Sequence, residues 1–393
     1  MTDSAVYVAY FSDNGGQSRR EIARLSTTGT GAIDPTWAPH PDAPNNPVGI
    51  VHAIVATESF VLVGGDFQRL NGSLALGIGK LDAASGARDD SFATQVQVPA
   101  AANVITRLPD GNLAVGGDFL LANNLSRPYL ARVQADGNLD ASWAPRLNGP
   151  VRQIVGSGNV LYVAGNFTSI GGVPRNGLAK LSGGHTDAAD PDWDPNPDGS
   201  VNALVVGGNS VFVAGYFTYI GGQNRNYLAK LSASGKGGVD AAWNPNPDNA
   251  VYALALGGAD LFVAGGFRTT GGQSRVSLAK IATTGIGTAE PLWNPNPLYR
   301  GSPVGDVALA LTGSNLYVAG DFDSIGGLSR NFLAKLDAGG DGAADPIWNP
   351  RVDHEVYSLA ANATSVYVNS VFAVVDGETK YGPVTQHYRN GHN

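Results

Sequence analysis

An arginine follows a Gly-Gly pair at regular intervals along the chain, in the pattern Gly-Gly-x-x-Arg, as at 171–175 and 221–225. A guanidinium group can form paired hydrogen bonds to carboxylates and other planar acceptors. A ring of such groups in exposed turns would hold a polar ligand. The alternative is that each arginine only stabilises its own turn, in which the two glycines supply positive φ angles. The candidate ligand-binding residues are Arg19, Arg127, Arg175, Arg225, Arg275 and Arg330.

Aspartates are densest between residues 187 and 198. A calcium loop needs about 6–8 oxygen ligands close together. This segment lacks the spacing of an EF-hand, so Asp190, Asp192 and Asp194 are only weak candidates for a metal site. We expect no bound metal and no cofactor.

Residue types that carry catalysis are absent or scattered. The chain has no cysteine, and its six histidines occupy no repeated position. The sequence contains no nucleophile-elbow motif, no zinc-protease motif and no phosphate-binding loop motif in a strand–turn–helix setting. Two carboxylates on one face could still form a glycosidase or lyase site. One acid recurs at the same turn position in each repeat, however, which argues for a structural role, so we expect a protein without catalytic activity.

Tryptophan marks one position of an internal repeat. We expect these rings to pack as wedges between neighbouring units, because a large aromatic side chain can bury about 150–250 Å². The alternative is a ring of exposed side chains that stack on sugars. The aromatic residues at this position are Trp37, Phe92, Trp143, Trp193, Trp243, Trp293 and Trp348.

An acid and a base recur in step with this aromatic residue. The acid stands three residues before the aromatic residue, and the base lies in the preceding strand-like segment. Because an unpaired buried cation is costly, we expect the two to form a structural pair in each unit. The acids are Asp34, Asp89, Asp140, Asp190, Asp240, Glu290 and Asp345, and the bases are Arg24, Lys80, Arg132, Lys180, Lys230, Lys280 and Lys335.

The elements that position these residues are short strands. A period of about 50 residues recurs along the chain. Within one period, 201–206, 211–220, 227–231 and the start of a short segment at 240–243 read as four strands, separated by glycine and asparagine. Because successive strands alternate in direction, the Gly-Gly-x-x-Arg turn and the Asn-Pro-Asn-Pro-Asp loop lie on the same face of the molecule, which we call the loop face.

Four antiparallel strands per repeat predict an all-β fold, a single β-propeller domain over residues 1–393. Seven blades are favoured, because a strand at 356–360 could join the strands near the N-terminus. Eight incomplete blades are the alternative. Residues 366–393 are then a tail in the first case and a degenerate last blade in the second.

Three motifs resemble the Delta-60 repeat family of β-propellers. They are Val-Gly-Gly-Asp-Phe at 115–119, Leu-Ala-Arg-Val at 130–133 and Gly-x-x-Asp-x-x-Trp at 137–143. The Gly-Gly pair and the later tryptophan are also similar, more loosely, to kelch repeats. The chain departs from the Delta-60 pattern in its tryptophans and its Asn-Pro-Asn-Pro-Asp turn. The resemblance implies a propeller and an exported or cell-surface bacterial protein, and it implies no catalytic residue.

Charge and hydropathy exclude several partners. The net charge of −8 argues against general binding of nucleic acid or anionic membranes. No apolar run is long enough to span a bilayer, and no signal peptide is visible, so we expect no membrane insertion. We expect an extracellular or cell-surface binding module for a glycan or protein at the loop face. The alternatives are a structural subunit that self-associates into a surface assembly and, less favoured, a glycoside hydrolase or lyase.

Overall fold

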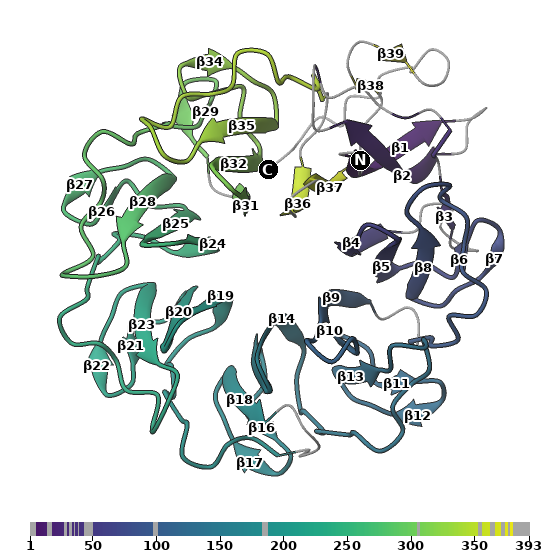
Figure 1. Cartoon of the computed structure of the whole chain (residues 1–393). Helices are drawn as coiled ribbons and strands as arrows, with labels where there is room; N and C mark the ends of the chain where they lie inside the picture. Colours follow the sequence, from purple (N-terminus) through teal and green to yellow (C-terminus); the bar gives the residue numbers. More distant parts are fainter. Residues whose placement is uncertain are drawn as a thin grey trace, which may run out of the picture.

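Short antiparallel sheets of the same build follow one another along the chain (Figure 1). The structure is a computed structural model. It describes residues 5–13, 18–26, 30, 34, 36–37, 39–42, 50–96, 101–182, 188–304, 307–352, 356–361, 366–370, 374–375 and 378–379. Within these ranges the regular elements are β-strands, and no helix is long and apolar enough to cross a membrane.

Six units each contain a three-stranded sheet, and we name each unit by its innermost strand in Figure 1. The innermost strands are β4 (Ile50–Ala56), β9 (Ala102–Arg107), β14 (Val151–Ser157), β19 (Val201–Gly207), β24 (Val251–Gly257) and β31 (Val307–Thr312). The second strands are β5 (Phe60–Asp66), β10 (Leu113–Gly117), β15 (Val160–Gly165), β20 (Ser210–Gly215), β25 (Asp260–Gly265) and β32 (Asn315–Gly320). The third strands are β8 (Ile78–Asp82), β13 (Leu130–Val133), β18 (Leu178–Ser182), β23 (Leu228–Ser232), β28 (Leu278–Ala282) and β35 (Leu333–Asp337).

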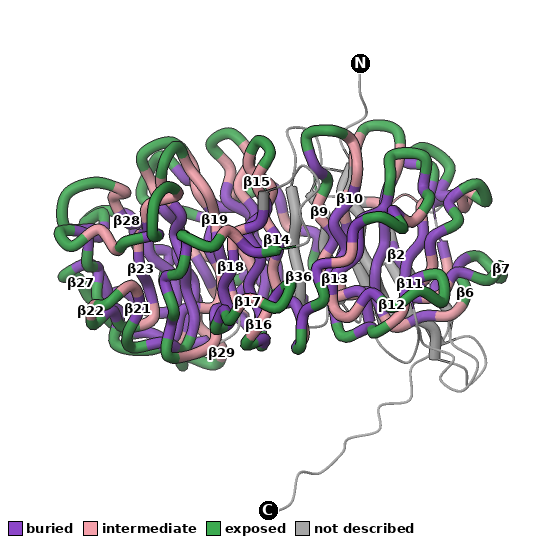
Figure 2. The backbone as a smooth tube through the Cα atoms, turned by 90° about the horizontal axis from the view of Figure 1, so that it is seen from below, coloured by how far each residue is buried: buried purple, intermediate pink, exposed green. Residues whose placement is uncertain are grey.

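The second strand of each unit is the most deeply buried. In β20, every residue from Val211 to Gly215 is buried. The neighbouring sheets cover both of its faces, which is why this strand is apolar along its length rather than alternating. Figure 2 shows these buried strands in the middle of the molecule, with exposed turns above and below.

Two expected strand boundaries are wrong. The strand predicted at 211–220 ends at Gly215, and Tyr219–Ile220 instead forms β21, which pairs with β22 (Gln223–Asn224) in a small hairpin. The Gly221–Gly222 turn has φ angles of 58° and 80°, and two successive positive φ angles suit a tight hairpin turn. The predicted fourth strand is reduced to single bridges such as Leu231 to Val239.

The same small hairpin recurs between the second and third strands of the other units, and those labelled in Figure 2 lie in the lower half of the molecule. The hairpins are β6–β7 (Arg69–Leu70 and Ser73–Leu74), β11–β12 (Leu121–Ala122 and Leu125–Ser126), β16–β17 (Ser169–Ile170 and Val173–Pro174), β26–β27 (Thr269–Thr270 and Gln273–Ser274) and β33–β34 (Ser324–Ile325 and Leu328–Ser329). Short additional strands extend two of them, namely β3 (Pro41–Asp42) beside β6, and the pair β29 (Leu298–Tyr299) and β30 (Ser302–Pro303) beside β33.

One further sheet combines segments from opposite parts of the sequence. Its order is β2 (Ser18–Ser26), β1 (Ala5–Asp13), β37 (Val366–Ser370) and β36 (Val356–Ala361). The strand expected at 356–360 is present, but β37 lies between it and β1, and β37 pairs with β1 in parallel. Residues 366–370 are therefore part of a sheet and not a tail. Beyond them, β38 (Val374–Val375) pairs with β39 (Glu378–Thr379), and residues 380–393 lie outside the described residues.

The tryptophans pack between consecutive units, as predicted. Trp243 is fully buried among side chains of the β19 and β24 units. Its ring meets Phe212 edge-on at 5.3 Å, and its Nε1–H donates to the carbonyl oxygen of Ala282 at 2.8 Å. Trp193 and Trp293 make the equivalent hydrogen bonds to Ser232 and Asp337. The alternative of sugar-stacking rings is wrong, because the six tryptophans and Phe92 are at most 7% exposed.

Candidate functional site

The loop that leaves one unit rests on the small hairpin of the next. The amide of Gly221 donates to the carbonyl oxygen of Pro195 at 2.6 Å, and Gly271 donates to Pro245 in the same way at 2.7 Å. The prediction that the Gly-Gly-x-x-Arg turns and the Asn-Pro-Asn-Pro-Asp loops share one face is therefore confirmed.

Carboxylates reinforce this contact. Asp198 accepts hydrogen bonds from the amides of Thr218 and Tyr219, and Asp248 accepts them from Arg268 and Thr269. Burial by itself would raise the pKa of Asp198, but the hydrogen bonds from Tyr219 and Thr218 outweigh it, so its pKa is lowered. These aspartates are thus held ionised as structural acceptors at the unit boundary.

The arginines of the Gly-Gly-x-x-Arg turns point inward. Arg225 is 7% exposed. One terminal nitrogen donates to the carbonyl of Asn224 at 2.8 Å, and the other donates to those of Asp240 and Ala241 at 3.1 and 3.0 Å. The guanidinium group therefore ties the hairpin to the turn before the tryptophan of its own unit. Equivalent arginines with the same burial and type of acceptor are Arg127, Arg175, Arg275 and Arg330.

These contacts favour the turn-stabilising alternative over ligand binding. Arg275 and Arg330 are 5% and 7% exposed, and this burial lowers the pKa of both guanidinium groups. Their hydrogen-bonding nitrogens already face backbone carbonyls, so they are not presented as an exposed ring. The side chain of Arg19, the remaining predicted ligand residue, lies outside the described residues.

The predicted acid–base pairs are present in most units. Lys230 contacts Asp240 at 2.9 Å, Lys80 contacts Asp89 at 2.7 Å, and Arg132 is the most buried base in such a pair, with Asp140. The hydrogen bonds from Lys80 and Ser91 lower the pKa of Asp89 from 3.8 to about 2. The further pairs are Arg24 with Asp34, Lys180 with Asp190, and Lys335 with Asp345.

The β24 unit is an exception, because Lys280 pairs with Asp260 at 3.1 Å and not with Glu290. Asp260 is the first residue of β25, where β20 begins with a serine. The cation is buried, so it requires a carboxylate partner, and the neighbouring strand supplies it. The pairing predicted for Glu290 is therefore wrong.

The weak metal candidates are engaged in this framework. Asp190 contacts Lys180 at 2.9 Å and accepts the amide of Asp192, while Asp194 lies 3.6 Å from a terminal nitrogen of Arg175. Among the described residues, no group of three or more His, Asp or Glu side chains is placed to hold a metal ion.

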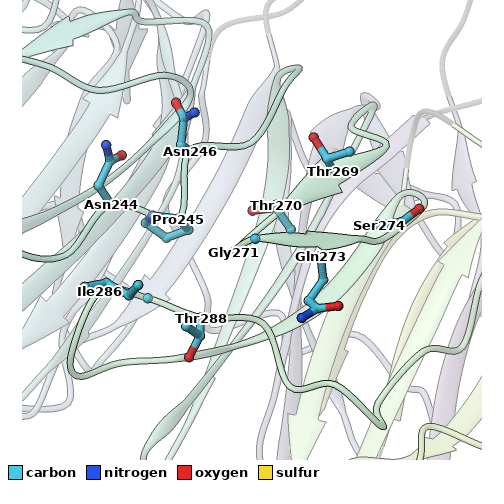
Figure 3. A pocket seen from close by; sticks show the side chains of 12 residues that line it. Asn244, Pro245, Asn246, Thr269, Thr270, Gly271, Gln273, Ser274, Ile286 and Thr288 are labelled. Carbon is cyan, nitrogen blue, oxygen red and sulfur yellow. The ribbon is translucent and has the colours of Figure 1, made fainter.

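A groove of about 550 Å³ lies on the loop face of the β24 unit (Figure 3). One wall is the loop at Asn244–Asn246, and a second is the hairpin β26–β27. The turn at 286–288 forms the third wall and carries Ile286, which is 66% exposed. The polar side chains of the groove are uncharged amides and hydroxyls, from Asn244, Asn246, Thr269, Thr270, Gln273, Ser274 and Thr288.

The backbone frame of this groove recurs, but its side chains vary. The amide of Asn244 donates to the carbonyl of Ile286 at 3.0 Å, and the same bond joins Asp194 to Lys236 and Asn294 to Asp341. The residue whose carbonyl accepts this hydrogen bond therefore differs between units: it is the apolar Ile286, the basic Lys236 or the acidic Asp341.

The sequence predictions placed the two loops of the groove on the binding face, but they named only the arginines as ligand residues and not the groove side chains. The available signal was variation inside the repeated turn: between the constant Gly-Gly pair and the arginine stand Val-Pro, Gln-Asn, Gln-Ser and Leu-Ser in successive units. Constant positions build the turn, whereas the varying positions reach the surface.

Comparisons with known proteins agree with this architecture. Residues 108–142, 159–183, 209–236 and 315–346 match the family model described as "Domain of unknown function (DUF5122) beta-propeller". No curated protein matches the sequence of this chain. The crystal structure of the computationally designed Ika8 protein is similar at a TM-score of 0.52, with 11% identity over 94% of this chain and 97% of that one. The chain is therefore an all-β protein of repeated sheet units, consistent with a β-propeller.

Proposed function

We propose that this chain is a non-catalytic binding module that holds a glycan or a protein on its loop face, outside the cell or at the cell surface. The observation that carries the proposal is the groove of the β24 unit, with amide and hydroxyl groups beside the exposed Ile286. Ligand sites combine an apolar surface with a few polar groups that fix orientation. The resemblance to Delta-60 repeats supports the location.

The finer architecture belongs to the same proposal. We take the molecule to be a seven-bladed propeller of the Delta-60 type, in which the sheet of β36, β37, β1 and β2 is the seventh blade. The support is that this sheet joins the two ends of the chain, and that β36 and β37 come close to β31 and β4, the innermost strands of the flanking units.

Electrostatics favour a non-catalytic role. A carboxyl group that acts as a general acid needs a raised pKa. Among the described residues, the carboxyl groups whose pKa is clearly shifted have a lowered pKa, such as Asp89, Asp140 and Asp240. Burial alone would raise the pKa of Asp140, but hydrogen bonds and the nearby Arg132 outweigh it and stabilise the ionised form. They serve as partners of lysine, arginine and backbone amides.

The test is a glycan array combined with affinity capture of proteins, followed by calorimetric titration of each ligand found. We expect Asn244→Ala with Gln273→Ala to weaken binding by about tenfold or more, a loss of about 1.4 kcal/mol. Gln223→Ala is the matched control, because Gln223 holds the same position in the hairpin of the preceding unit. Absence of any glycan or protein ligand would refute the proposal.

A second candidate function is self-association into a surface assembly. Leu292 and Ile347 stand immediately before two of the tryptophans and are 77% and 70% exposed. Other units carry Ser142, Asp192 or Ala242 there. Large exposed apolar side chains can mark interaction surfaces. Light scattering at high concentration tests this candidate: a concentration-dependent oligomer that Leu292→Ser with Ile347→Ser dissociates would support it, whereas a stable monomer would remove it.

A further inference from the structure

The small hairpin of the β24 unit departs from the others at one buried position. In the other five units, the first strand of this hairpin ends in a fully buried aliphatic residue, namely Leu70, Ala122, Ile170, Ile220 or Ile325. In the β24 unit the same position, the second residue of β26, is Thr270, which is only 1% exposed. Packing alone is satisfied by an aliphatic side chain, so the threonine points to a role other than packing.

The hydroxyl group of Thr270 forms no hydrogen bond within the protein. Its Oγ1 atom is buried, and among the residues that the structure describes no other buried hydroxyl lacks a partner. Ser277 in the same unit shows the contrast, because its buried hydroxyl donates to the carbonyl oxygen of Val304. A buried polar group without a partner destabilises a fold, so Thr270 is unfavourable for stability unless a group from outside the chain completes it.

Thr270 lies at the floor of the groove on the loop face. It is one of the residues that line the groove, and it is far less exposed than Ile286 on the third wall. In Figure 3 its hydroxyl oxygen lies on the side that faces the loop at Asn244–Asn246. The unpartnered hydroxyl is therefore directed towards the groove.

The chemistry of the groove favours an uncharged ligand that carries hydroxyl groups. Every side chain that lines the groove is uncharged. The corresponding frame of the β19 unit contains Asp194 and Lys236, and that of the β31 unit contains Asp341. The amides of Asn244 and Gln273 each offer a donor and an acceptor, which is what a hydroxyl group requires.

The size of the groove favours a small ligand over a protein. Its volume of about 550 Å³ lies within the range of about 300–1,000 Å³ that is usual for small-molecule sites. A stable protein interface would instead bury about 800 Å² on each partner. Pro245 and Ile286 give the groove an apolar surface for the C–H groups of a sugar ring.

We propose that the groove of the β24 unit binds a neutral saccharide, one hydroxyl of which forms a hydrogen bond with Thr270 at the floor. This inference rests on the proposed function, whose ligand class it narrows, and it adds a residue that determines specificity. The aliphatic residues at this position in the other five units cannot form the hydrogen bond, so the site belongs to the β24 unit.

The test is an array of neutral and acidic glycans, followed by calorimetric titration of the neutral glycan that binds best. Thr270→Val keeps the shape of the side chain but removes the hydroxyl, so we expect it to weaken binding about tenfold or more. The same variant should melt about 1–3 °C above the wild type, because it removes a buried polar group that has no partner in the protein.

Two further variants complete the test. Thr270→Ser keeps the hydroxyl and should bind within about threefold of the wild type. Ile220→Val is the matched control, because it changes the same position in the hairpin of the preceding unit and should leave the affinity unchanged.

The outcomes separate this inference from the proposed function. Wild-type affinity of Thr270→Val overturns the role of Thr270, and the groove remains the binding site if Asn244→Ala with Gln273→Ala still abolishes binding. A lower melting temperature of Thr270→Val also overturns it, because the hydroxyl would then have a structural partner. A ligand that is an acidic glycan or a protein overturns the neutral saccharide and leaves the binding module standing. Absence of every ligand overturns both.

Discussion

Replacement of Arg225 by methionine separates a structural arginine from a ligand-binding one. Methionine keeps most of the apolar stem but removes three hydrogen bonds, those to the carbonyls of Asn224, Asp240 and Ala241. Hydrogen bonds from a charged donor contribute about 1.5–3 kcal/mol each. Relief from burying the cation offsets part of this loss.

The net loss in free energy of unfolding should be about 2–4 kcal/mol. An unfolding entropy of about 2.1 cal/mol/K per residue converts this into a decrease in melting temperature of about 2–5 °C for a chain of this length. The melting temperature of Arg225→Lys should lie between those of the wild type and Arg225→Met, because lysine keeps the charge but not the planar guanidinium group.

Thermal and urea unfolding followed by circular dichroism measure this effect. Arg268→Met is the control, because Arg268 is an exposed arginine on the same face and its side chain has no comparable role. The reasoning fails if Arg225→Met melts within about 1 °C of the wild type. If that variant also lost ligand binding, Arg225 would be a ligand-binding residue as the sequence pattern first suggested.

Three further predictions concern the packing, the ion pairs and the glycines. Trp243→Phe should cost about 1–3 kcal/mol, because the carbonyl of Ala282 loses its donor, and an unchanged urea midpoint would contradict the wedge. The Lys80–Asp89 pair stabilises the fold above about pH 3.8, and this contribution is lost as the pH falls towards 2, through the lowered pKa of Asp89. Asp89→Asn should therefore flatten the fall of the urea midpoint between pH 4 and 2, and a parallel fall in both proteins would rule the pair out as its source. Gly215→Ala should cost more than about 3 kcal/mol, because its Cβ would lie 2.0 Å from the carbonyl oxygen of Ser200. Gly222→Ala meets no atom within 4 Å and should cost only about 1–2 kcal/mol for its φ of +80°, so equal melting temperatures of the two variants would contradict this contrast.

Local pattern was enough to predict the strands and the wedges. The apolar run at Val211–Gly215 and the tryptophan at 243 report burial directly, and burial recurs in every unit. The repeat also predicted the pairing of Lys230 with Asp240. A base and an acid that recur once per repeat, at nearly the same separation, are expected to be neighbours in each unit. The sequence did not predict that Lys280 pairs with Asp260 instead of Glu290, because this pairing depends on which strand lies beside Lys280.

The site was harder to predict than the fold. Arg225 stands in a glycine-rich turn, which suggests exposure, but its long stem carries the guanidinium group back under the turn. Ile286 stands in a short turn after the third strand, and only the hydrogen bond from the amide of Asn244 to its carbonyl oxygen shows that it forms a wall of the groove. Both features arise from three-dimensional register, which composition and spacing do not encode.

The sheet shared by β1 and β37 has a consequence for synthesis of the protein. Tyr7 pairs with Tyr367, so the ribosome must translate almost the whole chain before these two strands can meet. Contacts between residues so far apart form slowly, because a long loop must be closed first. Until then, the growing polypeptide carries unpaired strand edges that are prone to aggregate. Chaperones that shield nascent chains should therefore raise the yield of this protein more than that of a protein whose sheets close locally.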